Sequence, residues 1–529
     1  VKTKDGRAIL ANDMHMAISV PSVWYRCQLR FEGRDITGVG LPGTPLIIAG
    51  ATRHLAWGMT TLIADVLDLV KIEVNPKDPE EYRTPEGWRR FGVRPESIGV
   101  KGGLARGIDI KTTIWGPVAM TPLLGQPVAI HWTALDAEAV NIGLLDIDHA
   151  ETLEQGLALM NATGGPPLNV ILADRTGRIA WTTMGRLPLR RGFDGAVSRS
   201  WADGSVGWAG YIPPAELPRN VDPPQGFVVS ANNRSIGKDY PYPIGHGYAN
   251  GYRAYRIAER LRSMDRIQEE DMLELQLDTT AGVYGFYRDI ALGVLTPAAL
   301  AERPERRELR DYIESWDGRA ELGSLGLGVL VRFREALAKA VFEPFLRSCR
   351  ALDEAFEYYW VHRDIPLQAL LAAKDPRLVP ERERYGDWDA FLLAKLEESR
   401  QALMHQHSVK SLRDLTWGRI NVADYVHPLS RGIPGIGAFL DFSHDPLPGC
   451  GFCVRADSAR GGASERLVVS PAHPEDGILQ IPGGQSGHPL SSNYRDQYPY
   501  WVKGQPIGFL SGKPERSLRL VPAEQARPN

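Results

Sequence analysis

The chain is poor in the features that mark several common protein classes. Its formal net charge is only −3 at pH 7, so it has no excess of basic residues to hold nucleic acid or anionic lipid. No apolar run approaches the roughly 20 residues that a membrane-spanning helix needs. Four cysteines in 529 residues are too few for a fold built on disulfides. These absences favour a globular protein of ordinary composition.

The familiar catalytic motifs are also missing. There is no GxSxG elbow, P-loop or HExxH, and "GVGLPG" at 38–43 has no helix behind it that could cradle a phosphate. Cys450 and Cys453 form "CGFC", but a zinc site would need about two further ligands, of which His444 is the nearest candidate. The flanking residues predict a turn entering a strand, so a local disulfide or two packed thiols is the simpler interpretation.

What the chain does have is glycine, proline and tryptophan, which indicate many turns and much β-structure. Short apolar runs alternate with turns from residue 8 onward and continue to "GFVVSANNR"; "ADRTGRIAW" predicts a hairpin that turns at Arg175, Thr176 and Gly177. The hydrophobic period becomes helical near Tyr252, and strand patterns such as "WGRINVADYVHPL" return after Lys410.

These changes of period predict three parts. Residues 1–251 form a β-rich core, residues 252–410 form a mainly helical insertion, and residues 411–529 form a β-rich segment that returns to the core. No linker rich in serine or glycine separates them.

Three short segments concentrate polar side chains. "LANDMHM" at 10–16 places an amide, a carboxylate and an imidazole in four positions, although a turn and a buried histidine would also explain it. "WGMTTLIADVLD" carries two carboxylates three residues apart, Asp65 and Asp68. "VSANNRS" ends an apolar run with two amides that can donate hydrogen bonds, Asn232 and Asn233. Their combination with "GYRAYRI" favours a catalytic site.

These segments, in this order, resemble the β-subunit of the penicillin acylase family of N-terminal-nucleophile amidohydrolases. "WGRINVADYVHPL" and "PGGQSGHPLSSNYRDQ" extend the resemblance over almost the whole chain. The resemblance implies an α+β fold, a four-layer αββα sandwich of antiparallel sheets with a helical insertion. It also implies a zymogen that cleaves itself, an α-subunit partner from the same precursor, and a periplasmic or secreted location.

In that family the β-chain begins with a nucleophilic serine, which we expect several residues before Val1. The serine's own α-amine, with an unperturbed pKa of about 7.7–8.0, would act as its base. The resemblance assigns His15 to orienting the nucleophile and Arg253 to orienting the amide and the amine. Thr61 would supply a backbone N–H to the oxyanion hole and Asn232 a side-chain amide, with Asn233 as the alternative.

The resemblance also implies an acyl pocket and a structural calcium site. Met16, Trp24 and Ala49 would line the pocket, and Met16 and Ala49 lie where benzylpenicillin-specific members carry aromatic residues, so we expect a preference for aliphatic acyl groups. Asp65 and Asp68 would bind Ca²⁺ together with the Leu67 carbonyl. A third carboxylate of that site is replaced, with Ile244 about where it would fall. No organic cofactor is expected.

The predicted activity is hydrolysis of a linear amide bond in compounds such as penicillins or N-acyl-homoserine lactones, with a role in antibiotic metabolism or quorum quenching. Three alternatives remain. The chain could be a catalytically silent relative that acts as a binding or assembly subunit. It could be an aromatic-rich carbohydrate-binding or glycosidase module, although no catalytic carboxylate pair stands out. It could also be an oxidoreductase that uses "CGFC".

Overall fold

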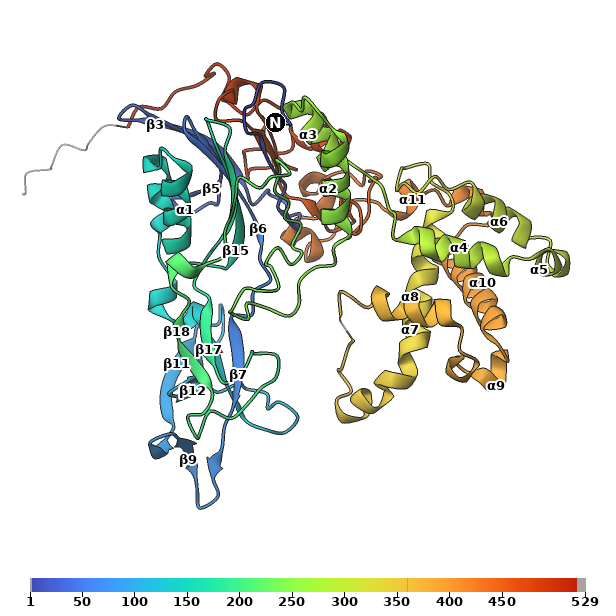
Figure 1. Ribbon diagram of the computed structural model, residues 1–529, viewed down its shortest axis with the longest axis horizontal. Helices are drawn as coiled ribbons and strands as arrows, with labels where there is room; N and C mark the ends of the chain where they lie inside the picture. Colours follow the sequence, from blue (N-terminus) through green and yellow to red (C-terminus); the bar gives the residue numbers. More distant parts are fainter. Residues whose placement is uncertain (1, 359, 521–529) are drawn as a thin grey trace, which may run out of the picture.

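The β-strands form one of two lobes in the computed structural model, which describes residues 2–358 and 360–520 (Figure 1). Its largest sheet has seven antiparallel strands in the order β19 (Asn220–Val221), β16 (Ile179–Met184), β15 (Leu168–Asp174), β6 (Leu55–Thr61), β5 (Ile47–Thr52), β4 (Arg34–Gly40) and β3 (Tyr25–Phe31). The predicted hairpin is confirmed, because β15 and β16 pair and the Gly177 N–H donates to the Asp174 carbonyl across the turn.

A second, smaller sheet packs against the first. It consists of β1 (Leu10–Asn12), β21 (Arg466–Val469) and β22 (Ile478–Gln480), so segments from both ends of the chain meet in it. Helix α1 (Leu153–Ala162) covers the outer face of the large sheet, and α3 (Glu269–Gln276) covers the outer face of the small one. The order helix, sheet, sheet, helix confirms the predicted αββα sandwich (Figure 1).

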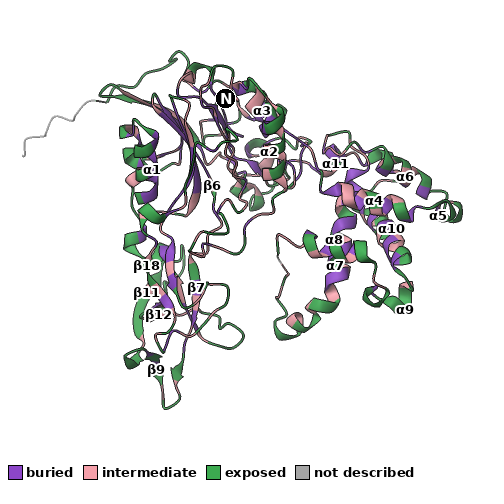
Figure 2. Cartoon of the chain, in the orientation of Figure 1, coloured by how far each residue is buried: buried purple, intermediate pink, exposed green. Residues whose placement is uncertain are grey.

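Strand β6 shows why the layers form. Leu55, Trp57 and Met59 point toward α1, whereas Ala56 and Gly58 point toward β1, because successive side chains of a strand face opposite sides. Residues 55–59 are buried, and Figure 2 shows the central strands buried along their length. The small residues on the inner face let the second sheet approach closely.

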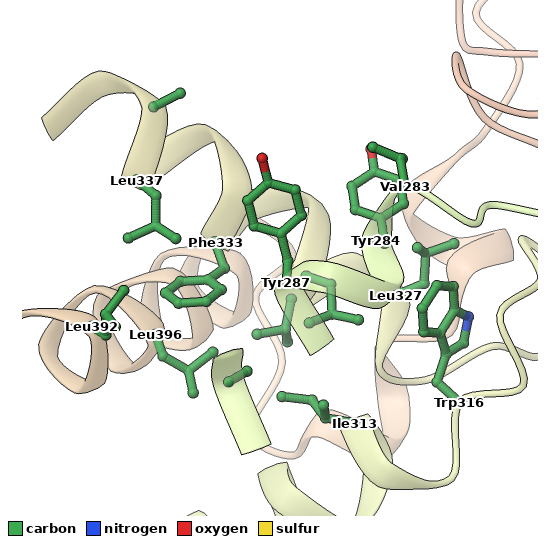
Figure 3. Close-up of a cluster of buried hydrophobic side chains, with 14 of the residues drawn as sticks. Val283, Tyr284, Tyr287, Ile313, Trp316, Leu327, Phe333, Leu337, Leu392 and Leu396 are labelled. Carbon is green, nitrogen blue, oxygen red and sulfur yellow. The ribbon is translucent and has the colours of Figure 1, made fainter. Parts of the chain in front are cut away.

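The second lobe is helical. Its helices are α4 (Tyr284–Val294), α5 (Pro297–Glu302), α6 (Arg306–Glu314), α7 (Leu327–Leu352), α8 (Asp364–Ala373), α9 (Arg382–Tyr385), α10 (Trp388–Gln406) and α11 (Trp417–Ile420). Tyr287, Phe333 and Leu396 belong to its own hydrophobic core, which Figure 3 shows between these helices.

The predicted helical insertion at 252–410 therefore divides into two parts. Helix α2 (Tyr252–Ser263) and α3 lie on the β-lobe, where Leu261 and Leu273 pack among residues of the sandwich and its loops. The separate helical core instead extends past residue 410, because Leu412, Leu415 and Trp417 pack into it.

The described part of the C-terminal segment, residues 411–520, contains less strand than the sequence pattern predicts for 411–529. The described strands there are β21, β22 and β20 (Gly461–Ala463), and the short helices α12 (Gly437–Leu440) and α13 (Tyr498–Lys503) lie between irregular segments. "WGRINVADYVHPL" begins with α11 and continues as a loop. "GFVVSANNR" is also irregular and has no strand assigned to it. Its Phe227 and Val229 belong to a hydrophobic cluster that includes Ile257 of α2.

Strand β2 (His15–Ala17) pairs with β20. The other strands form an extension of the β-lobe. They are β7 (Leu67–Lys71), β8 (Val74–Asn75), β9 (Asp78–Thr84), β10 (Gly87–Arg90), β11 (Gly92–Ile98), β12 (Arg106–Thr113), β13 (Gly116–Pro117), β14 (Val128–Trp132), β17 (Pro188–Arg191) and β18 (Gly207–Tyr211). Much of this extension is exposed (Figure 2). Among the described residues, no helix is long and apolar enough to cross a membrane.

The contact between β6 and β1 is so close that Gly58 cannot be enlarged freely. A Cβ atom there would lie 2.7 Å from Asn12 Cβ and 2.9 Å from Asn12 Cγ. We expect Gly58→Ala to lower the free energy of unfolding by about 1–3 kcal/mol, the usual cost of overpacking. Gly293→Ala is the control, because that glycine is exposed on α4 and a Cβ atom added to it would enter open space. Urea unfolding of both variants tests this, and an unchanged Gly58→Ala midpoint would contradict it.

Candidate active site

A cavity of about 460 Å³ opens beside the last residues of β6 and the link between β1 and β2. Polar groups of Asp13, His15, Asn232 and Arg253 lie on one part of its wall. The rest is mostly apolar and is lined by Met14, Met16, Trp24, Leu41, Leu46, Ile48, Met59, Leu144, Leu168, Met184, Ile257 and Val454. A few polar groups facing a large apolar space is the usual form of a small-molecule site.

Asn12 fixes the position of the segment that carries this polar wall. It is buried at the end of β1, where its Nδ2 donates to the Met59 carbonyl at 2.9 Å and its Oδ1 accepts from the Met59 N–H at 3.3 Å. The Asn12 carbonyl accepts a hydrogen bond from Gln276 of α3. Asn12 therefore joins the two sheets and does not itself line this cavity.

Asp13, His15 and Arg253 form a hydrogen-bonded row. Asp13 Oδ2 lies 3.2 Å from His15 Nε2, and Arg253 Nη1 lies 3.2 Å from His15 Nδ1. Because a guanidinium can only donate, Nδ1 accepts, and Nε2 is left to donate its proton to Asp13. Burial lowers the pKa of Arg253, and the charge of Asp13 opposes that effect.

Asn232 completes the row from the other side. Arg253 Nη2 donates to Asn232 Oδ1 at 2.8 Å and to the Ala231 carbonyl at 3.1 Å. This contact turns the Asn232 amide so that Nδ2 faces Thr61, whose carbonyl accepts from it at 3.1 Å. Asn232 has φ +63°, a left-handed conformation that asparagine tolerates better than most residues.

The neighbouring amide, that of Asn233, forms its hydrogen bonds within the loop. Asn233 Oδ1 accepts from the Ala231 N–H at 3.0 Å, and the residue does not line the cavity. The structure thus brings together His15, Thr61, Asn232 and Arg253, four of the residues that the sequence singles out. An amide NH₂ carries two hydrogens, so Asn232 can donate one to Thr61 and one to a ligand.

Two of the three predicted pocket residues line the cavity and the third does not. Met16 and Trp24 line the cavity, and the Trp24 indole is held by the Ser464 hydroxyl at 2.9 Å. Ala49 does not line it, so that prediction is wrong. Ala49 is fully buried between the two sheets, because its strand neighbour Ile48 takes the side that faces the cavity.

The predicted calcium ligands lie away from this cavity and contact an arginine. Arg190 Nε lies 2.9 Å from Asp68 Oδ2, and Arg190 Nη2 lies 3.3 Å from Asp65 Oδ1. Leu67 pairs with Trp132 in a two-stranded sheet, and Ile244 is buried in an apolar cluster. Among the described residues, no group of three His, Cys, Asp or Glu side chains is placed to hold a metal ion.

Two further residues were not predicted from the sequence as part of the site. Asp13 belongs to "LANDMHM", but its contact with His15 depends on the turn between β1 and β2. Glu465 Oε1 accepts from the Met14 N–H at 3.0 Å, and burial raises the pKa of Glu465 well above its usual value. Nothing in the residues around Glu465 signals that it would lie beneath the "LANDMHM" segment.

The "CGFC" pair belongs to the helical core. Cys450 and Cys453 are buried with their sulfurs 3.0 Å apart, and Cys453 donates to the Thr279 carbonyl. His444 Nδ1 contacts the Ala423 carbonyl, so it is engaged elsewhere. The loop has no strand on either side, contrary to the sequence pattern. The arrangement is that of two packed thiols.

The sequence profile of the penicillin amidase family matches residues 1–516. Acyl-homoserine lactone acylase QuiP of Pseudomonas aeruginosa is 25% identical, over 96% of this chain and 65% of that protein. Penicillin acylase 2 proenzyme of Pseudomonas sp. strain SE83 is 28% identical, over 99% of this chain and 68% of that protein. The chain thus spans about two thirds of the length of these relatives.

The fold has a counterpart among solved structures. A thermostable penicillin G acylase from Alcaligenes faecalis superimposes with a TM-score of 0.74 over 99% of both chains, at 19% sequence identity. At that identity the likeness shows the fold, that of the N-terminal-nucleophile hydrolases. The order of motifs in the sequence, the αββα layers and the family profile agree, and the chain belongs to the penicillin amidase family.

Proposed function

We propose that this chain is the β-subunit of an acylase, a hydrolase that cleaves the linear amide bond of N-acyl compounds. The observation that carries the proposal is the row from Asp13 through His15 and Arg253 to Asn232, which lies on the wall of an apolar cavity. The names of relatives such as QuiP and penicillin acylase 2 support the same reaction class.

The proposed nucleophile is a serine that precedes Val1. Its α-amine takes the hydroxyl proton as the oxygen attacks the amide carbonyl, and the same amine then protonates the departing nitrogen. The acyl group is left as an ester on the serine, which water hydrolyses in the second half of the reaction. His15 lies on the wall of the site, with its Nδ1 held by Arg253 and its Nε2 held by Asp13, so its fixed ring can orient the nucleophile by packing beside it.

The negative oxygen formed by the attack needs donors already in place. Asn232 Nδ2 and the Thr61 N–H are the proposed pair. Arg253 does not need to touch this oxygen. Its hydrogen bond to Asn232 Oδ1 prevents the amide from flipping, and its charge lies on the same wall, where negative charge develops.

The apolar part of the cavity supports an aliphatic acyl group as the substrate. Met14, Met16, Met59 and Met184 are flexible lining residues that can adapt to chains of different length, and among the described lining residues Trp24 is the sole Trp, Tyr or Phe. We therefore favour fatty acyl amides such as N-acyl-homoserine lactones over phenylacetyl compounds such as benzylpenicillin.

The remaining parts of the proposal follow from the family. The partner is an α-subunit cut from the same precursor by the enzyme itself, in keeping with the word proenzyme in the name of one relative. The proposed location is the periplasm or the outside of the cell. Neither a membrane span nor a nucleic acid is part of this proposal.

Asn232→Ala tests the oxyanion assignment. Loss of one preorganised donor raises the barrier by about 2.7–4 kcal/mol, so kcat should fall by about 10²–10³ in a hydrolysis assay on a fatty acyl amide. Asn233→Ala is the matched control, because the hydrogen bonds of its side chain to described residues stay within the loop, to Ala231 and Arg234. Wild-type turnover in a folded, processed Asn232→Ala enzyme would refute the oxyanion assignment. If this chain is a catalytically silent family member, neither the wild type nor any variant will turn over the substrate.

Asp13→Ala tests the hydrogen-bonded row. Without Asp13, His15 Nε2 and Arg253 lose their anionic partner, and a displacement of about 1 Å in a catalytic group can reduce kcat about a hundredfold. Asp13→Asn keeps an oxygen that accepts from Nε2 and should recover most of the activity with KM unchanged. An equal fall in kcat in both variants would show that the hydrogen bond from His15 Nε2 to residue 13 does not explain the effect.

A substrate panel tests the acyl pocket. Each methylene buried in the cavity contributes about 0.8 kcal/mol, so kcat/KM should rise about three- to fourfold per CH₂ from C6 until the cavity is filled. Glutaryl amides should react poorly, because their carboxylate would have to lie among methionines and leucines. Strict selectivity for phenylacetyl amides would contradict this pocket assignment.

A further inference from the structure

The two carboxylates that the family resemblance assigns to calcium already have a cation between them. Arg190 lies on β17, and its guanidinium reaches Asp68 with Nε and both the carbonyl and the carboxylate of Asp65 with Nη2. Its side chain is completely buried. The Trp208 indole also donates to Asp68 Oδ2, at 2.6 Å.

The surroundings are built for a guanidinium. The Arg190 carbon Cζ lies 5.9 Å from the centre of the Phe193 ring and 5.9 Å from the centre of the Trp208 ring, where cation–π attraction operates. Gly195, with φ +92°, closes over the pair. A Cβ atom at that position would lie 2.4 Å from Asp65 Oδ2 and 2.7 Å from Arg190 Nε.

The same surroundings do not suit Ca²⁺, which takes six to eight oxygen ligands. The Asp65 carbonyl and Asp68 Oδ2 already accept hydrogen bonds from Arg190. Ile244, at the expected position of a third carboxylate, has an apolar side chain that is buried among other apolar residues, and its carbonyl already accepts from the Asp65 N–H. The remaining nitrogen, Arg190 Nη1, is a buried donor without a partner among the described residues. A guanidinium nitrogen cannot bind a cation, and its positive charge would repel Ca²⁺.

We propose that Arg190 is a built-in replacement for the calcium ion, and that this protein neither binds nor needs Ca²⁺ at Asp65 and Asp68. The arginine would hold the Asp65 and Asp68 segments together, as the metal ion would otherwise do. The contact between Arg190 and Asp65 joins β17 to the segment that follows Thr61 at the end of β6. The Asp65 N–H also donates to the Ile244 carbonyl, which joins that segment to the loop before α2. This inference concerns stability and metal content, and it does not depend on the proposed activity.

The first test uses the wild-type enzyme, produced from its full-length precursor in medium with millimolar calcium. After desalting, metal analysis should find less than about one calcium ion for every ten chains. The Tm should be the same in EDTA and in millimolar CaCl₂. One calcium ion per chain, or a Tm that falls in EDTA and returns with CaCl₂, would overturn the proposal.

The second test removes the guanidinium. Arg190→Ala leaves the buried Asp68 carboxylate and the half-buried Asp65 carboxylate without their cation, and breaking such a pair should lower the Tm by about 5 °C or more. Millimolar CaCl₂ should recover part of that loss, because calcium can then enter. Arg191→Ala is the control, since its exposed side chain bonds only the Gly204 carbonyl among the described residues.

If Arg190→Ala does not fold, Arg190→Lys serves in its place, because lysine keeps the charge but cannot contact both aspartates in the same planar geometry. Its Tm should be lower than that of the wild type and insensitive to EDTA. A variant at this position as stable as Arg191→Ala would show that the guanidinium does not hold the two carboxylates, and the proposal would fail.

Discussion

The structure depends on one close contact between its two sheets. Asn12 at the end of β1 exchanges two hydrogen bonds with the backbone of Met59, and Gly58 beside it leaves the room that this approach needs. The contact satisfies a buried amide and fixes how far β1 advances along β6. Because Asp13 and His15 follow Asn12 closely in the chain, the same contact places them beside Thr61, which ends β6.

The site on this edge is assembled from four distant parts of the chain. The β1–β2 link and the start of β2 supply Asp13 and His15, β6 supplies Thr61, the loop before α2 supplies Asn232, and α2 supplies Arg253. Arg253 joins them, because its fork donates to His15 and to Asn232 at once. A planar guanidinium with five N–H donors can hold two neighbours in fixed orientation, which a lysine could not do.

Arginine has the same role elsewhere in the fold. Arg190 holds Asp65 and Asp68 in the segment that follows the active-site edge, Arg466 holds the fully buried Asp457, and Arg334 holds Asp364 in the helical core. A buried carboxylate must be paired and hydrogen-bonded to remain charged, and a guanidinium does both. The protein therefore joins separate segments of its chain with internal cations, which is consistent with the proposed replacement of the calcium ion.

The sequence by itself determined the alternation that makes strands such as β6 and the β15–β16 hairpin, because this follows from local spacing. The order of its motifs carried the family resemblance, and that resemblance implied the residues gathered at the site. Only the tertiary structure decided which amide faces the cavity, since Asn232 and Asn233 differ in φ and partner and not in type. It also excluded Ala49 from the pocket, left "GFVVSANNR" unpaired against α2, and placed Arg190 between two aspartates more than a hundred residues away. Such contacts depend on packing between remote segments, which no pattern of neighbouring residues records.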